Sequence, residues 1–161
     1  MGKRSASRVD EVVESLRRAS SEKARKDMAR YGIPDQDALG VPMRVMKEIA
    51  KHIGRDHGLA LDLWATGIYE ARTVAVFVDQ PDEVTSAQMD KWASSFNSWA
   101  ICDTACFNLF DRTQHAWAKM KKWNPSKKEF VRRASYALLW ALALHDKAAG
   151  DAKFATALRM V

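Results

Sequence analysis

Two residue types that could perform chemistry stand four positions apart near the middle of the chain: Trp99 and Asp103, within SFNSWAICDTACFNLFDR. On a helix, this spacing places an indole and a carboxylate on one face, one turn apart. The apolar residues around them predict a largely buried segment, in which a carboxylate is costly unless it is paired, hydrated or used in a reaction. Two roles are therefore open for Asp103. It could form an ion pair with Arg72 or Arg133 on a stacked helix, or it could act on a substrate.

The segments that must position these residues are predicted to be one helix after another. Apolar residues recur at helical spacing, and no stretch alternates with the two-residue period of a strand. Ser98 can cap the helix that carries Trp99 and Asp103. Pro42 fits the first turn of an earlier helix, and Ser126–Glu129 is a capping box that predicts the start of a later one. The predicted helices cover residues 9–16, 21–31, 42–53, 59–66, 69–78, 86–96, 99–112, 113–123, 126–144 and 151–161.

A weak internal repeat underlies these helices. Tryptophans close the first helix of each of three pairs at intervals of 28 and 31 residues, and these are Trp64, Trp92 and Trp123. The second helices carry Arg72, Asp103 and Arg133 at similar intervals. Helix pairs of this period stack into a solenoid whose second helices line a concave face. The sequence thus predicts an all-α, HEAT/armadillo-like α-solenoid of tandem antiparallel helix pairs, a single domain over residues 1–161.

Composition narrows the class of protein. The chain has 161 residues and a net charge of +6, which favours a polyanionic partner. It has no apolar run near the roughly 18 residues of a membrane span and no apolar N-terminal leader, so we expect a cytoplasmic protein. Cys102 and Cys106 share a helical face without further ligands, which favours two reduced core cysteines over a metal site. We also expect four tryptophans to pack in the core rather than to stack on bases, and these are Trp64, Trp92, Trp123 and Trp140.

Four segments together carry a resemblance to a known family. They are LGVPMRVMKEIAKHI, LWATGIYEARTVAVFVDQ, SWAICD and EFVRRASYALLWAL. Each motif is short, but their order and the repeat spacing make the match fairly specific. Over roughly residues 8 to 145, the chain resembles the DNA alkylation repair glycosylases of the AlkD type.

The resemblance implies HEAT-like repeats whose concave surface holds duplex DNA, and hydrolysis of the glycosidic bond of cationic N3- and N7-alkylated purines. By position, Trp99 matches the family's aromatic residue that packs on the deoxyribose, and Asp103 matches its catalytic carboxylate. Arg133 matches the arginine that contacts DNA beside the lesion. The family places another aromatic residue in a later repeat, so we expect this chain to be shortened at its C-terminal end relative to the family. The further candidates for contact with DNA are Arg132, Arg72 and Tyr69.

The residue types agree with that chemistry. An alkylated purine already carries the positive charge that makes it a good leaving group, so no general acid is needed. The transition state needs a stabilised oxocarbenium sugar and a positioned water, which one carboxylate can supply. An indole face adds about 0.5–2 kcal/mol of attraction for the cation. We expect double-stranded DNA with alkylated bases as the partner, a monomer associated with the nucleoid, and no cofactor, metal or membrane. The alternative is a non-catalytic HEAT-repeat module that binds DNA or protein.

Overall fold

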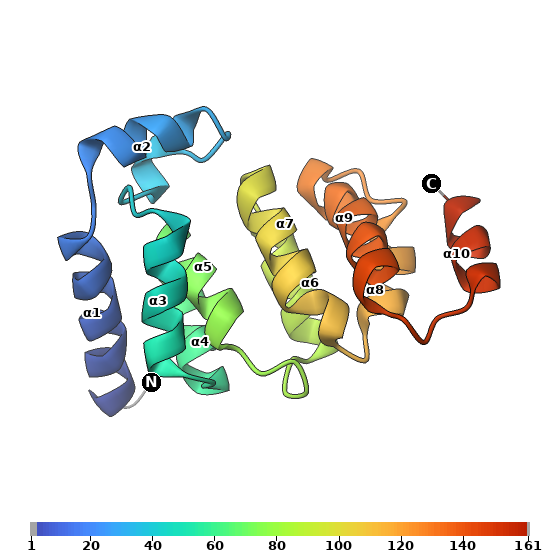
Figure 1. The fold of residues 1–161 in the computed structure, drawn as a ribbon, viewed down its shortest axis with the longest axis horizontal. Coiled ribbons are helices and arrows are strands. Elements are labelled where there is room, and N and C mark those ends of the chain that lie inside the picture. Colours follow the sequence, from blue (N-terminus) through green and yellow to red (C-terminus); the bar gives the residue numbers. More distant parts are fainter. Residues whose placement is uncertain (1–2, 161) are drawn as a thin grey trace. The chain divides into compact units, whose positions relative to one another are not determined.

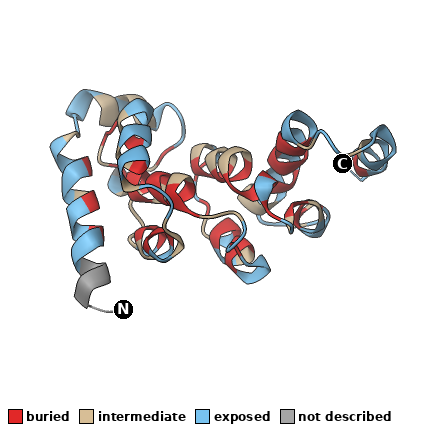
Figure 2. Cartoon of the chain, turned by 60° about the horizontal axis from the view of Figure 1, so that its bottom comes forward, coloured by how far each residue is buried: buried red, intermediate tan, exposed pale blue. Residues whose placement is uncertain are grey.

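The computed structural model describes residues 3–160, and within that range all of its regular secondary structure is helical. It contains ten α-helices, α1 to α10, two short 3-10 helices, η1 and η2, and no β-strand (Figure 1). Figure 2 shows that the buried residues follow the helix faces that pack against neighbouring helices. The prediction of an all-α chain is confirmed.

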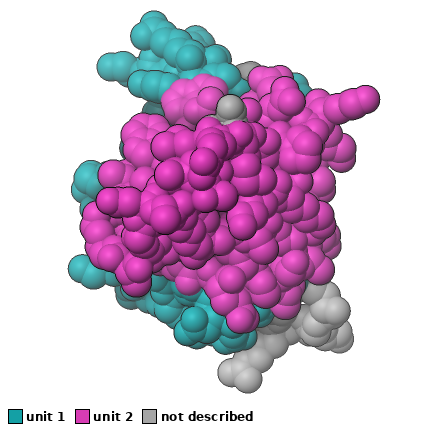
Figure 3. Space-filling view, turned by 90° about the vertical axis from the view of Figure 1, so that its right-hand side faces the viewer, with its two compact units in different colours: residues 1–83 teal, residues 84–161 magenta. Residues whose placement is uncertain are grey.

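Contacts divide the chain into two compact units, residues 1–83 and 84–161, which are coloured separately in Figure 3. The single domain expected over residues 1–161 stays a prediction, and residues 1–2 and 161 of that range lie outside the described part of the chain.

In the first unit, α5 is the central helix. It packs against α3 and α4, and α1 packs against both α4 and α5. Most residues of α5 are buried, which is why its apolar residues cover every side of the helix rather than one stripe. The elements of this unit are α1 (Lys3–Arg18), α2 (Glu22–Ala29), η1 (Asp35–Asp37), α3 (Met43–Ile53), α4 (His57–Ala65) and α5 (Tyr69–Val78).

A buried carboxylate on α5 holds the loop that leads into α3. Glu70 is fully buried, and its Oε1 accepts hydrogen bonds from the backbone N–H groups of Leu39 (3.0 Å), Gly40 (2.7 Å) and Val41 (3.2 Å). Gly40 has φ +87°, and a Cβ there would lie 2.5 Å from the carbonyl oxygen of Ser21. The carboxylate therefore satisfies three donors that no helix or strand pairs.

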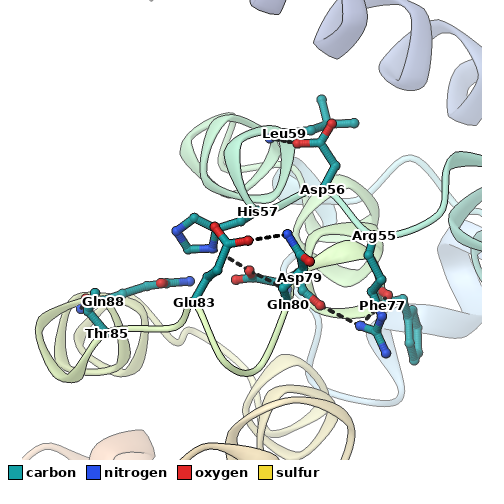
Figure 4. Close-up of polar contacts among 10 residues, drawn as sticks. All are labelled: Arg55, Asp56, His57, Leu59, Phe77, Asp79, Gln80, Glu83, Thr85 and Gln88. Carbon is teal, nitrogen blue, oxygen red and sulfur yellow. Dashed lines mark hydrogen bonds and ion pairs between the residues drawn. The ribbon is translucent and has the colours of Figure 1, made fainter.

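Side chains at the start of α4 tie that helix to the end of α5 (Figure 4). Arg55 donates through Nη1 to the carbonyl oxygens of Phe77 (3.0 Å) and Asp79 (2.5 Å). The buried carboxylate of Asp79 lies 2.6 Å from Nδ1 of His57 and accepts from the backbone N–H of Gln80 at 2.8 Å. Arg55 thereby satisfies carbonyl groups at the end of α5 that have no partner within the helix, and His57 pairs with the carboxylate that follows it.

In the second unit, α9 is the central helix and packs against α7, α8 and α6. Phe110 is fully buried and lies among three aromatic rings, with ring centroids 6.2 Å away for Trp92, 6.4 Å for Phe96 and 6.0 Å for Trp123. The elements are α6 (Ser86–Ser94), α7 (Trp99–Asn108), η2 (Phe110–Arg112), α8 (Ala116–Trp123), α9 (Glu129–His145) and α10 (Asp151–Leu158).

Two of the predicted helix-start signals act differently in the structure. Pro42 is the N-cap of α3 rather than part of its first turn. The predicted capping box does not form, because α9 begins at Glu129 with Lys128 as its N-cap, and no side chain caps it. The hydroxyl of Ser126 instead accepts from the backbone N–H of Lys128 at 3.2 Å, which makes a local turn before the helix.

The predicted core tryptophans are confirmed at three of four positions. Trp64, Trp92 and Trp123 are buried near the ends of α4, α6 and α8. The prediction for Trp140 is wrong, because its side chain on α9 is 63% exposed. None of the described helices is long and apolar enough to cross a membrane.

Candidate functional site

Helix α7 presents Trp99 and Asp103 on its exposed side. Ser98 is the N-cap, and its hydroxyl accepts from the backbone N–H of Ile101, so the helix starts at Trp99 as the sequence predicts. Ile101 and Cys102 face the core, whereas Trp99 is 39% exposed and the Asp103 side chain is 25% exposed. The carboxylate thus lies at the edge of a buried segment, in contact with solvent.

Arg133 on α9 reaches both residues. Its Nε donates to Oδ1 of Asp103 at 2.9 Å, and its Nη2 donates to Oδ2 at 2.7 Å. The same guanidinium lies over the Trp99 ring, 5.7 Å from the ring centroid. Hydrogen bonding to Asp103 raises the pKa of Arg133 above its usual value. The structure therefore brings Trp99, Asp103 and Arg133 into one cluster, and of the two ion pairs left open for Asp103 it shows the one with Arg133.

This cluster keeps capacity for a ligand. Each carboxylate oxygen has a second lone pair, so the two bonds from Arg133 leave Asp103 able to accept from a water or to face a cation. Arg133 uses two of its N–H donors on Asp103, and a guanidinium has further donors suited to a phosphate. The forked geometry also fixes the orientation of the carboxylate, which a single hydrogen bond would not do.

Two thiols fix α7 against α9 beneath the cluster. Sγ of Cys102 lies 3.5 Å from the carbonyl oxygen of Phe130, and Sγ of Cys106 lies 3.6 Å from that of Ala134. Both cysteines are free and buried, as predicted, and burial raises the pKa of the Cys106 thiol well above its usual value. Their role is packing, because a buried neutral thiol is a poor nucleophile and a poor metal ligand.

Arg72 and Arg132 show that the predicted alignment of the repeats is wrong by one residue at Arg72. Its Nε donates to the carbonyl oxygen of Trp64 at 3.3 Å, and Arg132 makes the same contact with Asn124, also at 3.3 Å. Both arginines are fourth residues of their helices, whereas Asp103 and Arg133 are fifth residues. Arg72 is therefore equivalent to Arg132. It also lies over the Trp64 ring at 5.3 Å, and burial lowers its pKa.

Tyr69 has little surface available for DNA. It is the first residue of α5 and only 7% exposed, and burial raises the pKa of its hydroxyl. Sequence reasoning placed this residue at a helix start, where exposure is common, but packing inside the first unit covers it. Tyr69 is therefore not available as a contact for DNA.

The net positive charge is carried entirely by the second unit. Residues 84–161 contain 12 lysines and arginines against 6 aspartates and glutamates, whereas residues 1–83 contain 14 of each kind. The unit with the Trp99–Asp103–Arg133 cluster is thus the one whose charge suits a polyanion. This division could have been read from the sequence had the boundary between the units been known.

Some of that positive charge has a structural role that sequence reasoning missed. Lys119 is buried, and its Nζ lies 2.6 Å from Oδ2 of Asp90, which Lys122 also contacts at 2.7 Å. Trp123 donates through Nε1 to Oδ1 of Asp90 at 2.8 Å. Burial works to raise the pKa of Asp90, but the hydrogen bonds from the two lysines and Trp123 outweigh it and lower the pKa to about 2. Asp90 therefore neutralises a lysine that belongs to the core.

Comparison with known proteins agrees with these features. The packed helix pairs define a HEAT-like repeat protein. A similar solved structure comes from a family described as related to the HEAT-like repeat DNA glycosylases, with affinity for branched DNA structures. The TM-score is 0.83 and the sequence identity 26%, over 94% of this chain and 65% of that protein's length. The model of the DNA alkylation repair enzyme family matches residues 12–160, so the chain belongs to that family. No curated protein matches the chain significantly.

Proposed function

We propose that this protein acts in DNA repair by hydrolysing the N-glycosidic bond of cationic N3- and N7-alkylated purines in duplex DNA. The observation that carries the proposal is the cluster of Trp99, Asp103 and Arg133, in which an oriented carboxylate, an exposed indole and an arginine share one partly exposed surface. Membership of the DNA alkylation repair enzyme family and the positive charge of the second unit support a DNA substrate.

In the proposed reaction, the alkylated purine leaves with the electron pair of the C1′–N bond, which neutralises its positive charge. The sugar then carries the positive charge as an oxocarbenium ion, and the Asp103 carboxylate stabilises it electrostatically. A water that donates a hydrogen bond to the Asp103 carboxylate adds its oxygen to C1′, and its proton passes through the carboxylate to solvent. The exposed part of the Trp99 ring attracts the sugar cation by a cation–π effect of the kind that the ring already makes with the Arg133 guanidinium.

Arg133 has two roles in this proposal. Its fork holds both oxygens of Asp103 in place, and its remaining donors bind a phosphate of the DNA beside the lesion. Arg132 lies one position away on the same helix and is exposed, so it is proposed as a second phosphate contact.

A second candidate function is binding of branched DNA without base excision. One observation favours it: both Asp103 oxygens already accept from Arg133, which is also the arrangement of a purely structural ion pair. The similar solved structure belongs to a family described as having affinity for branched DNA structures. In this alternative, the second unit binds phosphates and Asp103 only positions Arg133.

The test is single-turnover release of 7-methylguanine and 3-methyladenine from methylated duplex DNA by the wild type and the Asp103→Asn variant. Removing one preorganised electrostatic group slows such reactions about 10²–10³-fold, and we expect a loss of that size with DNA affinity nearly unchanged. Asp151→Asn is the matched control, because Asp151 is an exposed carboxylate on α10.

Three other outcomes are informative. If Asp103→Asn releases bases at the wild-type rate, Asp103 is a structural partner and the mechanism is wrong. A wild type that releases no base but binds a four-way junction more tightly than a linear duplex would establish the second candidate. If the wild type neither releases a base nor binds DNA at low salt, both candidates are refuted, since phosphate contacts are strongest there.

A further inference from the structure

The Trp99–Asp103–Arg133 cluster continues along the same two helices into a second pair of side chains. Phe107 follows Asp103 by four residues on α7, and Trp140 follows Arg133 by seven on α9, so each lies on the face of the residue it follows. Their ring centroids lie 5.2 Å apart at an interplanar angle of 88°, an edge-to-face contact. The α7–α9 pair thus presents an ion pair and an aromatic pair side by side.

Trp140 is unusually exposed for a residue held in this way. Its side chain is 63% exposed, and the same face of α9 carries Tyr136, 43% exposed, and Leu144, 46% exposed. Packing against Phe107 restricts the motion of the indole while leaving much of its surface open. Exposed apolar side chains gathered on one helix face, rather than scattered singly, are a feature of binding surfaces.

We propose that Trp140 is a stacking platform for an unpaired nucleobase of DNA bound at the Trp99–Asp103–Arg133 cluster. The inference rests on the proposed binding of DNA there, and it adds a preference for DNA with an unstacked base near the lesion. An indole carries no positive charge to attract a phosphate, but its face stacks on any base, and the bases of an unbroken duplex already cover each other's faces. The base is therefore available to Trp140 only where the duplex is opened.

Charge favours DNA over a second copy of the chain as the occupant. The second unit carries the entire net charge of +6, so two such units brought together would repel each other. The same charge attracts a nucleic acid, and Arg133 lies two helical turns from Trp140 on α9. A phosphate on Arg133 and a base on Trp140 are contacts that one strand can make together.

The experiment compares two DNA probes of the same duplex sequence at fixed salt. One is an unbroken duplex, and the other carries a short flap of unpaired thymines. Stacking of one base contributes about 1–3 kcal/mol, so Trp140→Ala should weaken binding of the flapped probe about 5- to 150-fold and binding of the unbroken duplex less than about 2-fold. Trp140→Phe should retain most of the selectivity. Leu158→Ala is the control, because Leu158 is also 63% exposed but lies on α10, and it should change neither affinity.

Equal losses on the two probes, or no loss on either, would overturn the inference. So would a concentration-dependent dimer that Trp140→Ala abolishes, measured by sedimentation, because the patch would then belong to a second copy. Base release by the wild type, measured separately, distinguishes this failure from failure of the proposed function. If the wild type releases alkylpurines but Trp140→Ala weakens binding of the two probes equally, or weakens neither, only the inference fails. Selective loss of flapped-probe binding without base release by the wild type supports the inference and refutes excision.

Discussion

Replacement of Glu70 by alanine should strongly destabilise the first unit. The Glu70 carboxylate accepts from three backbone N–H groups, of which those of Gly40 and Val41 belong to buried residues and that of Leu39 is partly open to water. A buried donor left without a partner costs about 1–3 kcal/mol, so two such donors correspond to about 2–6 kcal/mol. We expect a loss of about 4 kcal/mol in the free energy of unfolding. For a chain of this length, that lowers Tm by roughly 8–16 °C.

The assay for this prediction is urea unfolding followed by far-ultraviolet circular dichroism, together with a thermal scan. Glu70→Gln should have an intermediate effect, because its amide oxygen can still accept from the two buried donors, as Oε1 does now, but lacks the negative charge that strengthens those hydrogen bonds. The control is Glu48→Ala, which removes an exposed carboxylate paired with Arg44 on α3 and should change stability by less than about 0.5 kcal/mol. A Glu70→Ala variant within about 1 kcal/mol of the wild type would refute the reasoning, since it would mean that the loop satisfies its N–H groups without the carboxylate.

Two further predictions concern the second unit. Because the pKa of Asp90 in the folded protein is about 2, below its ordinary value of 3.8, Asp90 stabilises the fold above about pH 4 and loses that effect as pH falls toward 2. The Asp90 side chain is about one-third exposed, so solvent screens part of this effect. Asp90→Asn should lower the free energy of unfolding by about 1–2 kcal/mol at pH 6 and by little at pH 2. Urea unfolding at the two pH values tests this, and the same loss at both would contradict it. Arg133→Ala should weaken binding to damaged and undamaged duplexes alike, and the slope of log affinity against log salt concentration should become shallower by about one. Trp99→Ala should instead slow excision more than it weakens binding. Salt titrations paired with single-turnover base release test both, and equal effects on binding with no added loss of rate for Trp99→Ala would mean that this surface only holds DNA.

The helices could be predicted from the sequence because their causes are local. Apolar residues at helical spacing define which face is buried, and the serine at position 98 ends the preceding loop by accepting a backbone N–H at the first turn of α7. The juxtaposition of Trp99 and Asp103 is equally local, since residues four apart on a helix always share a face. The burial of Trp64, Trp92 and Trp123 follows from their recurrence at the ends of helices that pack in pairs.

Only the tertiary structure decided which distant residues meet. An error of one residue rotates a helical position by about 100°, so spacing alone could not tell whether Arg72 is equivalent to Arg133 or to Arg132. The contact with the carbonyl of the preceding helix shows that it is equivalent to Arg132. The fork between Arg133 and Asp103 likewise depends on how α7 and α9 pack, which the two buried thiols help to fix.

The burial of some individual side chains likewise could not be predicted from the sequence alone. The sequence analysis expected a core position for Trp140 and a contact with DNA for Tyr69, whereas Trp140 is 63% exposed and Tyr69 is buried. The carboxylate of Glu70 can be fully buried because three backbone N–H groups of a loop about 30 residues earlier in the chain donate hydrogen bonds to it. The sequence by itself determined where the helices run and which residues share a helical face, because those depend on the backbone of one segment. The tertiary structure determined the partner and the exposure of each side chain, because those depend on a neighbouring helix whose position no local pattern encodes.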